Sequence, residues 1–390
     1  MTEVDLDPYD PDLTEPGVWD VYAAARAAGP VARSARRGGF WVLTGYDDVR
    51  AALRDTATFS SASGHRIPTD GTQRSIPIDF DPPLHTAYRR LMGPALSTAR
   101  VRALRPFLER TIADLVGRFA ARGGGDFVRE VALPLPLAVL TELVGFAPET
   151  VERFREVTEQ MWSGLTADGD EVDFAGAARR VSELMASELA AHREHAADDF
   201  VTTLLTAEID GRPLGEDERI SILATFAVAG HETTMNAAST LVALLLEDPA
   251  RQERLRADPS RAKGFVEEML RHRSPAQNFA RRATCPVSVG GQLVEEGDAV
   301  LLSFAAANRD PARFADPERF DPDRDVRGHL GFGWGIHACP GAALARTELT
   351  ILLTTLCAHP RLHLSDEVRW SGLQGGNHLG PTALPVRFEE

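Results

Sequence analysis

Apolar residues recur every three to four positions over most of the chain, the spacing that places them on one face of an α-helix. The pattern predicts amphipathic helices over six segments: Trp19 to Ala28, Asp47 to Arg54, His85 to Thr98, Leu104 to Arg122, Pro148 to Leu165 and Phe174 to His195. Strand patterns are fewer and shorter: Phe40 to Thr44, a hairpin of Val287 to Val289 with Ala299 to Phe304 around Gly290 and Gly291, and Leu384 to Phe388. We therefore expect a mainly α (α+β) fold with a small β-sheet region.

The longest predicted helix runs from Glu216 to Glu247 and ends at Asp248 and Pro249. At 1.5 Å per residue it would be about 48 Å long. Its middle reads AGHETT, residues 229 to 234, which places a glycine, an acid and two β-branched hydroxyl residues where a plain core helix would carry aliphatic side chains. This interruption indicates a functional segment.

The composition is that of an ordinary globular protein, with 43% hydrophobic and 25% charged residues among 390. The formal charge of −15 argues against nucleic acid or an anionic membrane surface as the main partner. Neither a signal peptide nor a run of about 18 apolar residues is found, so we expect a cytoplasmic protein. Cysteine occurs only three times, which favours a reducing compartment and a cysteine that acts alone.

The most informative segment is glycine-rich and carries Cys339 to the start of a predicted helix; residues 331 to 341 read GFGWGIHACPG. Pro340 suits a first helical turn, so we expect the sulfur beside unpaired N–H groups, which favour the thiolate. Such a thiolate is a nucleophile or a metal ligand. Gly333 and Gly335 would let the backbone approach a flat group, which favours haem iron as the metal.

These residues match the pattern FGxGxHxCxG at all six fixed positions, namely Phe332, Gly333, Gly335, His337, Cys339 and Gly341. The segment resembles the haem-binding loop of the cytochrome P-450 superfamily. The AGHETT segment in turn is similar to the family's oxygen-activating segment. The resemblance implies that Cys339 ligates the iron of haem b, that Thr233 holds dioxygen and a protonating water, and that Glu232 relays protons.

Glu268 and Arg271 form an ExxR motif, in which a spacing of three places both side chains on one helix face. Alone the motif is weak, because surface pairs of this kind are common. It lies between AGHETT and the cysteine loop, in the family order, and so resembles the buried ion pair of that family. The resemblance links this pair with the arginine of a PERF sequence, here Arg319.

The two propionates of haem need cationic or hydrogen-bonding partners when they are buried. His85 and Arg89, four residues apart, resemble the family's HTxxR segment, although Leu84 stands where the family usually has an acid. His337 and Arg281 complete the expected set. Arg282 is an alternative to Arg281, because the two arginines are adjacent.

The resemblance implies one haem-thiolate monooxygenase domain over residues 1–390 that inserts an atom of O2 into a substrate. By position we expect the substrate pocket to be lined by Thr225, Val228, Ala229, Gln277 and Phe279, with part of the loop from Ser60 to Phe80 as a roof. These side chains predict a small to medium, largely apolar substrate with one polar anchor.

Two electrons must come from outside, because the remaining cysteines cannot hold an iron–sulfur centre and no flavin domain is present. We expect a ferredoxin with its reductase as the donor. The arginines that would offer it a positive face are at 89, 90, 100, 102 and 105. Other hypotheses are a haem-thiolate enzyme that couples or rearranges its substrate or uses peroxide directly, and a non-catalytic haem-binding protein.

Overall fold

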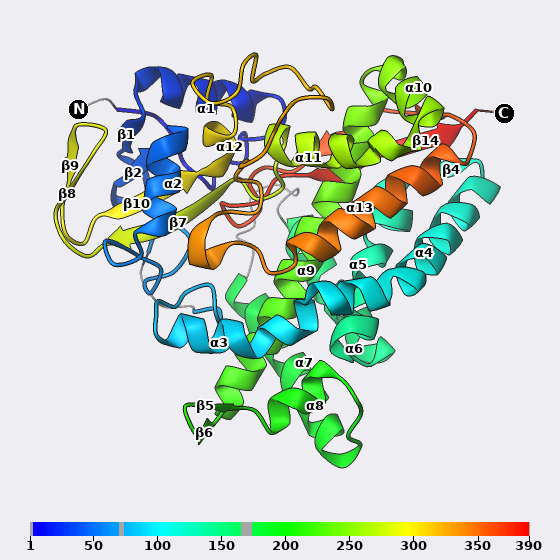
Figure 1. Cartoon of the computed structure of the whole chain (residues 1–390), viewed down its shortest axis with the longest axis horizontal. Coiled ribbons are helices and arrows are strands. Elements are labelled where there is room, and N and C mark those ends of the chain that lie inside the picture. Colours follow the sequence, from blue (N-terminus) through cyan, green and yellow to red (C-terminus); the bar gives the residue numbers. More distant parts are fainter. Residues whose placement is uncertain (1–2, 70–73, 165–173, 390) are drawn as a thin grey trace.

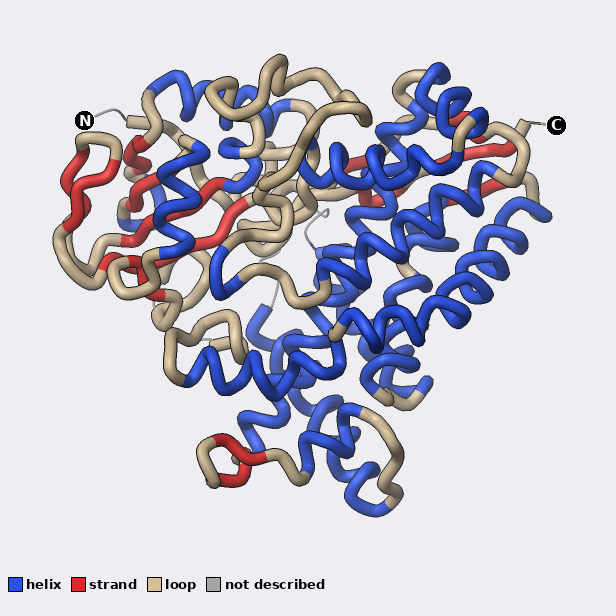
Figure 2. The backbone as a smooth tube through the Cα atoms, viewed as in Figure 1, coloured by secondary structure: helices blue, strands red, loops and turns tan. Residues whose placement is uncertain are grey.

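The structure, a computed structural model, describes residues 3–69, 74–164 and 174–389. Helices make up most of it (Figures 1 and 2). Their bounds are α1 Gly17–Ala28, α2 Tyr46–Arg54, α3 Leu84–Met92, α4 Thr98–Ala121, α5 Pro134–Val144, α6 Pro148–Gly164, α7 Phe174–Glu194, α8 Phe200–Leu205, α9 Glu216–Leu246, α10 Pro249–Ala257, α11 Ala262–His272, α12 Phe304–Ala307 and α13 Ala342–Cys357. The prediction of a mainly helical chain is confirmed.

The strands of the main sheet gather on one side of the molecule, at the left of Figure 1. The main sheet has the order β1-β2-β10-β7-β3, formed by Val31–Ser34, Phe40–Leu43, Ala299–Ser303, Asn278–Ala283 and Phe59–Ser60. A three-stranded sheet near the C-terminus joins β11, β14 and β4, formed by Leu362–Leu364, Pro385–Phe388 and Gly124–Asp126. Two-stranded pairs are β5 (Glu208–Ile209) with β6 (Arg212–Pro213), β8 (Val287–Val289) with β9 (Gln292–Val294), and β12 (Arg369–Trp370) with β13 (Pro381–Ala383).

Helix α9 runs through the helical part and packs against α5, α7, α11 and α13 (Figure 1). Three acidic residues in its first turn complement the positive end of the helix dipole, and the N–H of Gly215 donates to Glu218 Oε2 at 2.7 Å. Its second half is almost wholly buried. The middle is different, because Ala229 and Gly230 are exposed although the turns on both sides are packed. This break in the packing marks the candidate site.

Two predictions about how segments are joined are wrong. The helix expected over His85 to Thr98 is divided, because α3 ends at Met92 and a 3-10 turn over Gly93–Leu96, with Pro94 lacking an N–H, precedes α4. The hairpin expected between β8 and β10 is also absent: β8 pairs with β9, and β10 pairs with β7 and β2. Gly290 and Gly291 form the tight β8–β9 turn with positive φ. The expected helix end at Leu165 lies outside the described residues.

Three apolar clusters hold these elements together. The largest joins the helices around α9, and two smaller ones cover the faces of the main sheet. Burial of apolar side chains is the principal stabilising contribution to such a fold. Among the described residues no helix is both long and apolar enough to span a bilayer.

Candidate haem site

The cysteine loop is an irregular turn that is held together by backbone hydrogen bonds within the loop. The N–H of Cys339 donates to the carbonyl of Phe332 at 2.9 Å, and the N–H of Gly333 donates to the carbonyl of Leu330 at 2.8 Å. Gly333 and Gly335 adopt φ of 67° and 70°, which favours glycine. A side chain at Gly335 would place Cβ 2.5 Å from the carbonyl of Leu53, so this glycine serves the contact with the end of α2. This contact is a structural reason for glycine at position 335, and the approach of its backbone to a flat ligand stays a prediction.

Cys339 precedes helix α13 rather than beginning it. The helix begins at Ala342, so Pro340 lies outside its first turn, contrary to the prediction. The cysteine side chain is accessible, yet the protein surrounds it closely. Desolvation raises the pKa of the thiol, and the N–H of Gly341 and the Arg89 guanidinium oppose this only in part. We predicted that the helix start stabilises the thiolate, but here its N–H groups do so only in part. A bound metal ion is the group that would deprotonate the sulfur.

Two histidines meet beside this loop. The rings of His85, on α3, and His337 lie 4.2 Å apart between centroids. Ser61 Oγ is 3.1 Å from His337 Nε2, whereas both ring nitrogens of His85 are buried without a hydrogen-bond partner. Desolvation lowers the pKa of His85 to about 4 and that of His337 to about 2. Without an anion both rings are therefore neutral near pH 7, and each can offer an N–H to one.

Arg89 and Arg281 are the cations of this region. Arg89, on α3, donates to the carbonyl of Ala338 at 2.8 Å, next to the cysteine. Arg281 is 3% exposed, and among the described residues its guanidinium donates only to the carbonyl of Ala280, its own neighbour. Desolvation lowers the pKa of Arg281 to about 10, so it keeps its charge. Within the described residues neither guanidinium forms an ion pair, and the carboxylates of Asp79 and Asp81 act on Arg281 only from beyond ion-pair distance. The donated hydrogen bonds go to carbonyls, so both cations can meet an external anion.

The strand β7 decides between the adjacent arginines. Successive side chains of a strand point to opposite faces, and here Arg281 is buried while Arg282 is exposed. Arg282 donates to the carbonyl of Thr69 at 2.9 Å on the outer side. Of the two alternatives, only Arg281 has its side chain inside the molecule.

The middle of α9 carries the acid and the alcohol. Thr233 is partly exposed and its Oγ1 donates to the carbonyl of Ala229 at 2.7 Å, within its own helix. Glu232 is 3% exposed, and its Oε1 has no hydrogen-bond partner. Desolvation raises the pKa of Glu232 to about 8, with a smaller opposing effect of Arg66. The carboxyl therefore holds its proton near neutral pH.

The predicted pocket residues divide into two groups. Thr225, Val228 and Phe279 are partly exposed and Ala229 is exposed. Gln277 is different: it is 0% exposed and its Nε2 donates to the carbonyl of Ser274. Gln277 therefore presents no accessible surface to a substrate in this structure, although its Oε1 is buried without a hydrogen-bond partner among the described residues. Of the predicted roof from Ser60 to Phe80, residues 70–73 lie outside the described residues.

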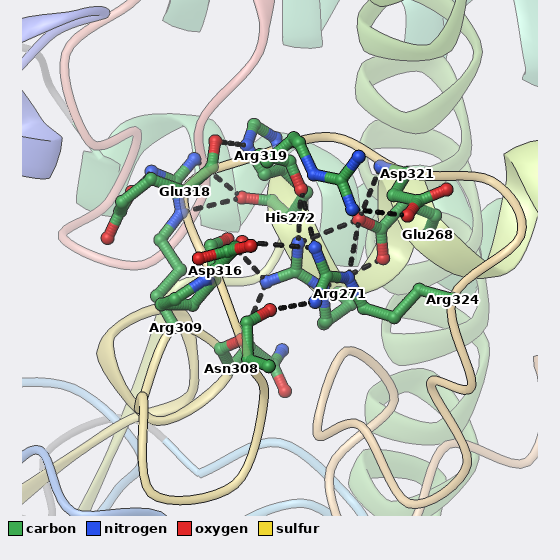
Figure 3. Close-up of polar contacts among 12 residues, drawn as sticks. Glu268, Arg271, His272, Asn308, Arg309, Asp316, Glu318, Arg319, Asp321 and Arg324 are labelled. Carbon is green, nitrogen blue, oxygen red and sulfur yellow. Dashed lines mark hydrogen bonds and ion pairs between the residues drawn. The ribbon is translucent and has the colours of Figure 1, made fainter.

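The ExxR pair is buried and completely hydrogen-bonded (Figure 3). Arg271 donates to both carboxylate oxygens of Glu268 at 2.8 Å, and neither side chain is more than 1% exposed. Arg271 also donates to the carbonyls of Asn308 and Pro317 at 3.0 and 2.8 Å. The N–H of Asp321 donates to Glu268 at 2.8 Å. This network ties α11 to the irregular segment that leads to the cysteine loop.

Arg319 does not belong to this network through its side chain. Its guanidinium is 66% exposed and pairs with Asp321 at 2.9 Å, and only its carbonyl meets Arg271. After Arg271, the second guanidinium beside Glu268 is that of Arg324 (Figure 3). Its Nε lies 3.3 Å from Glu268 Oε1, and its side chain is 11% exposed. The prediction of Arg319 as the third member is wrong, because the chain turns between the two positions and presents Arg324 to the carboxylate.

Together these residues fit a flat, dianionic group with a metal at its centre. Cys339 is accessible and lies near Arg89, while Arg281 lies near His85 and His337, and the buried ring nitrogens of His85 have no hydrogen-bond partner. The centre of α9 presents only small groups, at Ala229 and Gly230. Helix α13, which follows the cysteine loop, packs on α9. Pattern reading missed His378, which meets Glu232 from a distant segment and forms no local motif. Ser61 and Arg66 lie in the predicted roof segment but were not singled out; Ser61 meets His337, and the charge of Arg66 acts on Glu232.

The chain belongs to the cytochrome P450 family, whose sequence profile matches residues 170–371. It is a haem-thiolate monooxygenase, and haem b with a thiolate ligand is its cofactor. O2, a small-molecule substrate and a redox partner are the reactants that this class uses.

Among its relatives, cytochrome P450 107B1 of Saccharopolyspora erythraea is 37% identical over 349 residues, which cover 85% of each chain. The 6-deoxyerythronolide B hydroxylase of the same organism is 34% identical over 394 residues, covering 94% of this chain and 95% of the relative. The structure of cytochrome P450 CYP109Q5 from Chondromyces apiculatus superposes with a TM-score of 0.84 and 31% identity, over 99% of this chain and 98% of that one.

Proposed function

We propose that Cys339 supplies the thiolate ligand and that the enzyme oxygenates a small to medium, largely apolar substrate with electrons from a ferredoxin-type donor. The observation that carries this proposal is the accessible Cys339 next to Arg89, together with the buried Arg281, because neither guanidinium forms an ion pair among the described residues. When bound, haem b supplies the redox chemistry that divides O2 between substrate and water. The remaining steps depend on side chains of the chain.

Arg281 and Arg89 would neutralise the haem propionates, with His85 and His337 as neutral N–H donors. This assignment is supported by the two guanidinium groups, which donate to carbonyls and form no ion pair among the described residues, and by the ring nitrogens of His85, which have no hydrogen-bond partner. Hydrogen bonds from charged donors to carboxylates are among the strongest in proteins. Holding both propionates would fix the orientation of the group above Cys339.

Glu232 and Thr233 would deliver and hold protons on the opposite side. Glu232 keeps its proton at neutral pH because its carboxyl is buried. The Thr233 hydroxyl, by donating to Ala229, leaves its oxygen lone pairs to accept a hydrogen bond from water or substrate. General-acid groups of this kind accelerate proton transfer by about 10² to 10⁴-fold.

The substrate is expected to be largely apolar, because Val228, Ala229 and Phe279 provide the accessible surface of the predicted pocket. Phe279 is held by stacking on Phe304, with ring centroids 5.4 Å apart. Since Gln277 is buried, Thr225 is the remaining polar residue of the predicted lining. A spectral shift induced only by large, highly charged compounds would contradict this substrate class.

The donor is expected to dock on the arginines near α3 and the start of α4. Arg90 and Arg102 are exposed, whereas Arg100 is engaged with the carbonyl of Glu142 and Arg105 with Glu109. An acidic ferredoxin complements such a face in spite of the net charge of the chain. Charge reversal at Arg90 and Arg102 should slow reduction and leave substrate binding unchanged.

The proposed function is tested by the absorption spectrum of the reduced protein under carbon monoxide. Thiolate ligation by Cys339 gives a strongly red-shifted Soret band, and the change Cys339→Ala should abolish it, with Cys285→Ala as the control. Product analysis under ¹⁸O2, with ferredoxin, reductase and NADH supplied, should show one labelled oxygen in the product. An unaltered band in Cys339→Ala, or unlabelled product, would refute the proposal.

A further inference from the structure

Glu232 faces a histidine that lies 146 positions further along the chain. The Oε1 of Glu232 and the Nδ1 of His378 are 3.5 Å apart. Both atoms are buried, and neither has a hydrogen-bond partner among the described residues. Hydrogen bonds of catalytic groups are often long before the reactants bind, and a small side-chain rotation would close this one. The contact therefore joins a proton-bearing acid to a group that can exchange protons with it.

The histidine belongs to a tight turn that is fastened to α9. The N–H of Gln374 donates to the carbonyl of His378 at 2.7 Å, and the N–H of His378 donates back to Gln374 at 3.1 Å. The side-chain amide of Asn236, one helical turn beyond Glu232, donates to Gln374 Oε1 at 3.1 Å. The turn is also tied to strand β7, because Asn377 Nδ2 donates to the carbonyl of Asn278 at 3.0 Å. These bonds hold the imidazole against the carboxyl.

The surroundings keep this pair uncharged. Arg66, which donates to the carbonyl of Gly375 at 3.1 Å, acts on both Glu232 and His378, and His65 acts on His378. Desolvation and the nearby positive charge lower the pKa of His378 to about 3. An imidazolium is thus disfavoured. The ring can pass a proton only when it gains one and loses another together.

We propose that His378 returns a proton to Glu232 after the carboxyl has given its own to the distal side of the site. This inference rests on the proposed role of Glu232 as the proton donor. The imidazole Nδ1–H bond breaks and an O–H bond forms on Glu232, while Nε2 takes a proton from a water molecule that is itself reprotonated from bulk solvent. The side chain of His378 is 11% exposed, so water has access to part of the ring. Proton exchange with water then restores the starting tautomer.

His378 acts through Glu232 and is therefore a positioning and relay residue. Two variants separate these roles. His378→Asn keeps an N–H near the position of Nδ1 but has no second ring nitrogen, and His378→Phe keeps the ring without either nitrogen. Glu232→Gln and the double variant Glu232→Gln with His378→Asn complete the set. Each is assayed for substrate-induced spectral shift, for product per NADH, for hydrogen peroxide per NADH and for the solvent isotope effect.

We expect both His378 variants to bind substrate as the wild type does. Product per NADH should fall about tenfold, with hydrogen peroxide rising, because a relay group contributes at least that much to proton delivery. The solvent isotope effect should increase. The double variant should be no worse than Glu232→Gln alone, since coupled residues are not additive. Wild-type product yield in His378→Asn would overturn the relay and leave only a hydrogen-bonding role.

A second readout does not depend on turnover. The infrared C=O band of the protonated Glu232, identified by its loss in Glu232→Gln, should change frequency in His378→Asn in the resting protein. An unchanged band would overturn the contact, and the band decides the question if His378→Phe folds poorly. If Glu232→Gln itself gives wild-type product yield, the proposed function of Glu232 fails and the relay with it. An impaired Glu232→Gln beside a normal His378→Asn overturns the relay alone.

Discussion

Two regions of this molecule bury charged and polar side chains, and they treat them in opposite ways. Around Glu268 and Arg271 the buried oxygens and guanidinium nitrogens have short, direct partners. Around Cys339, in contrast, His85 has two ring nitrogens without a hydrogen-bond partner, and Arg281 forms no ion pair among the described residues. Burying an unpaired polar group costs free energy, so the second arrangement is retained only where a ligand meets it. A satisfied network indicates structure, and an unsatisfied one indicates a site.

The strongest test breaks the satisfied network. Arg271→Leu leaves Glu268 as a buried carboxylate without its main partner, and we expect a loss of about 3 to 5 kcal/mol in the free energy of unfolding. Urea denaturation of the purified protein measures it. Arg319→Ala is the matched control and should cost less than about 1 kcal/mol, because its side chain is exposed. Equal losses of unfolding free energy in Arg271→Leu and Arg319→Ala would contradict the finding that the side chain of Arg319 lies outside this network.

The unsatisfied region is tested by its paired arginines. Arg281→Gln should speed transfer of haem to an excess of an apoprotein acceptor by about tenfold, since a charged hydrogen bond to a carboxylate contributes about 1.5 to 3 kcal/mol. The adjacent Arg282→Gln, on the outer face of β7, should leave the transfer rate unchanged. If Arg282→Gln had the larger effect, the assignment of Arg281 to the propionate would be refuted.

A smaller effect on stability is expected for a buried acid that lies outside the candidate site. Glu348 on α13 is 2% exposed, and desolvation alone raises its pKa to about 8. Because the folded state binds this proton more tightly than the unfolded state, Glu348 stabilises the fold below its unfolded pKa. This contribution declines as pH rises towards 8. Glu348→Gln should flatten the fall in unfolding free energy between pH 5 and 8 by up to about 1.4 kcal/mol per pH unit.

Thermal and urea unfolding across that pH range measure the effect. The exposed Glu149→Gln is the control and should follow the wild type. Product per NADH should be unchanged in Glu348→Gln, in contrast to Glu232→Gln, whose carboxyl is equally buried but lies in the oxygen-activating segment. A pH profile of Glu348→Gln identical to that of the wild type would show that this carboxyl is ionised in the fold.

The sequence by itself determined the class of the protein, the helical character of the chain and the segments that carry the chemistry. Helix α9 begins at Glu216 as predicted, and Thr233 donates to its own helix as its residue type allows. These features follow from spacing along a few turns of chain, where local geometry fixes which side chains share a face. For the same reason Glu268 and Arg271, three residues apart, were recognisable as a pair.

The tertiary structure decided everything that depends on distant segments. It turned Arg281 inward and Arg282 outward, buried Gln277 and replaced Arg319 with Arg324 beside Glu268. It also brought His378 to Glu232. No local pattern encodes these choices, because each depends on how a strand or turn is packed against an element far away in the sequence. Burial, set by that packing, then determines which of the titratable groups are charged.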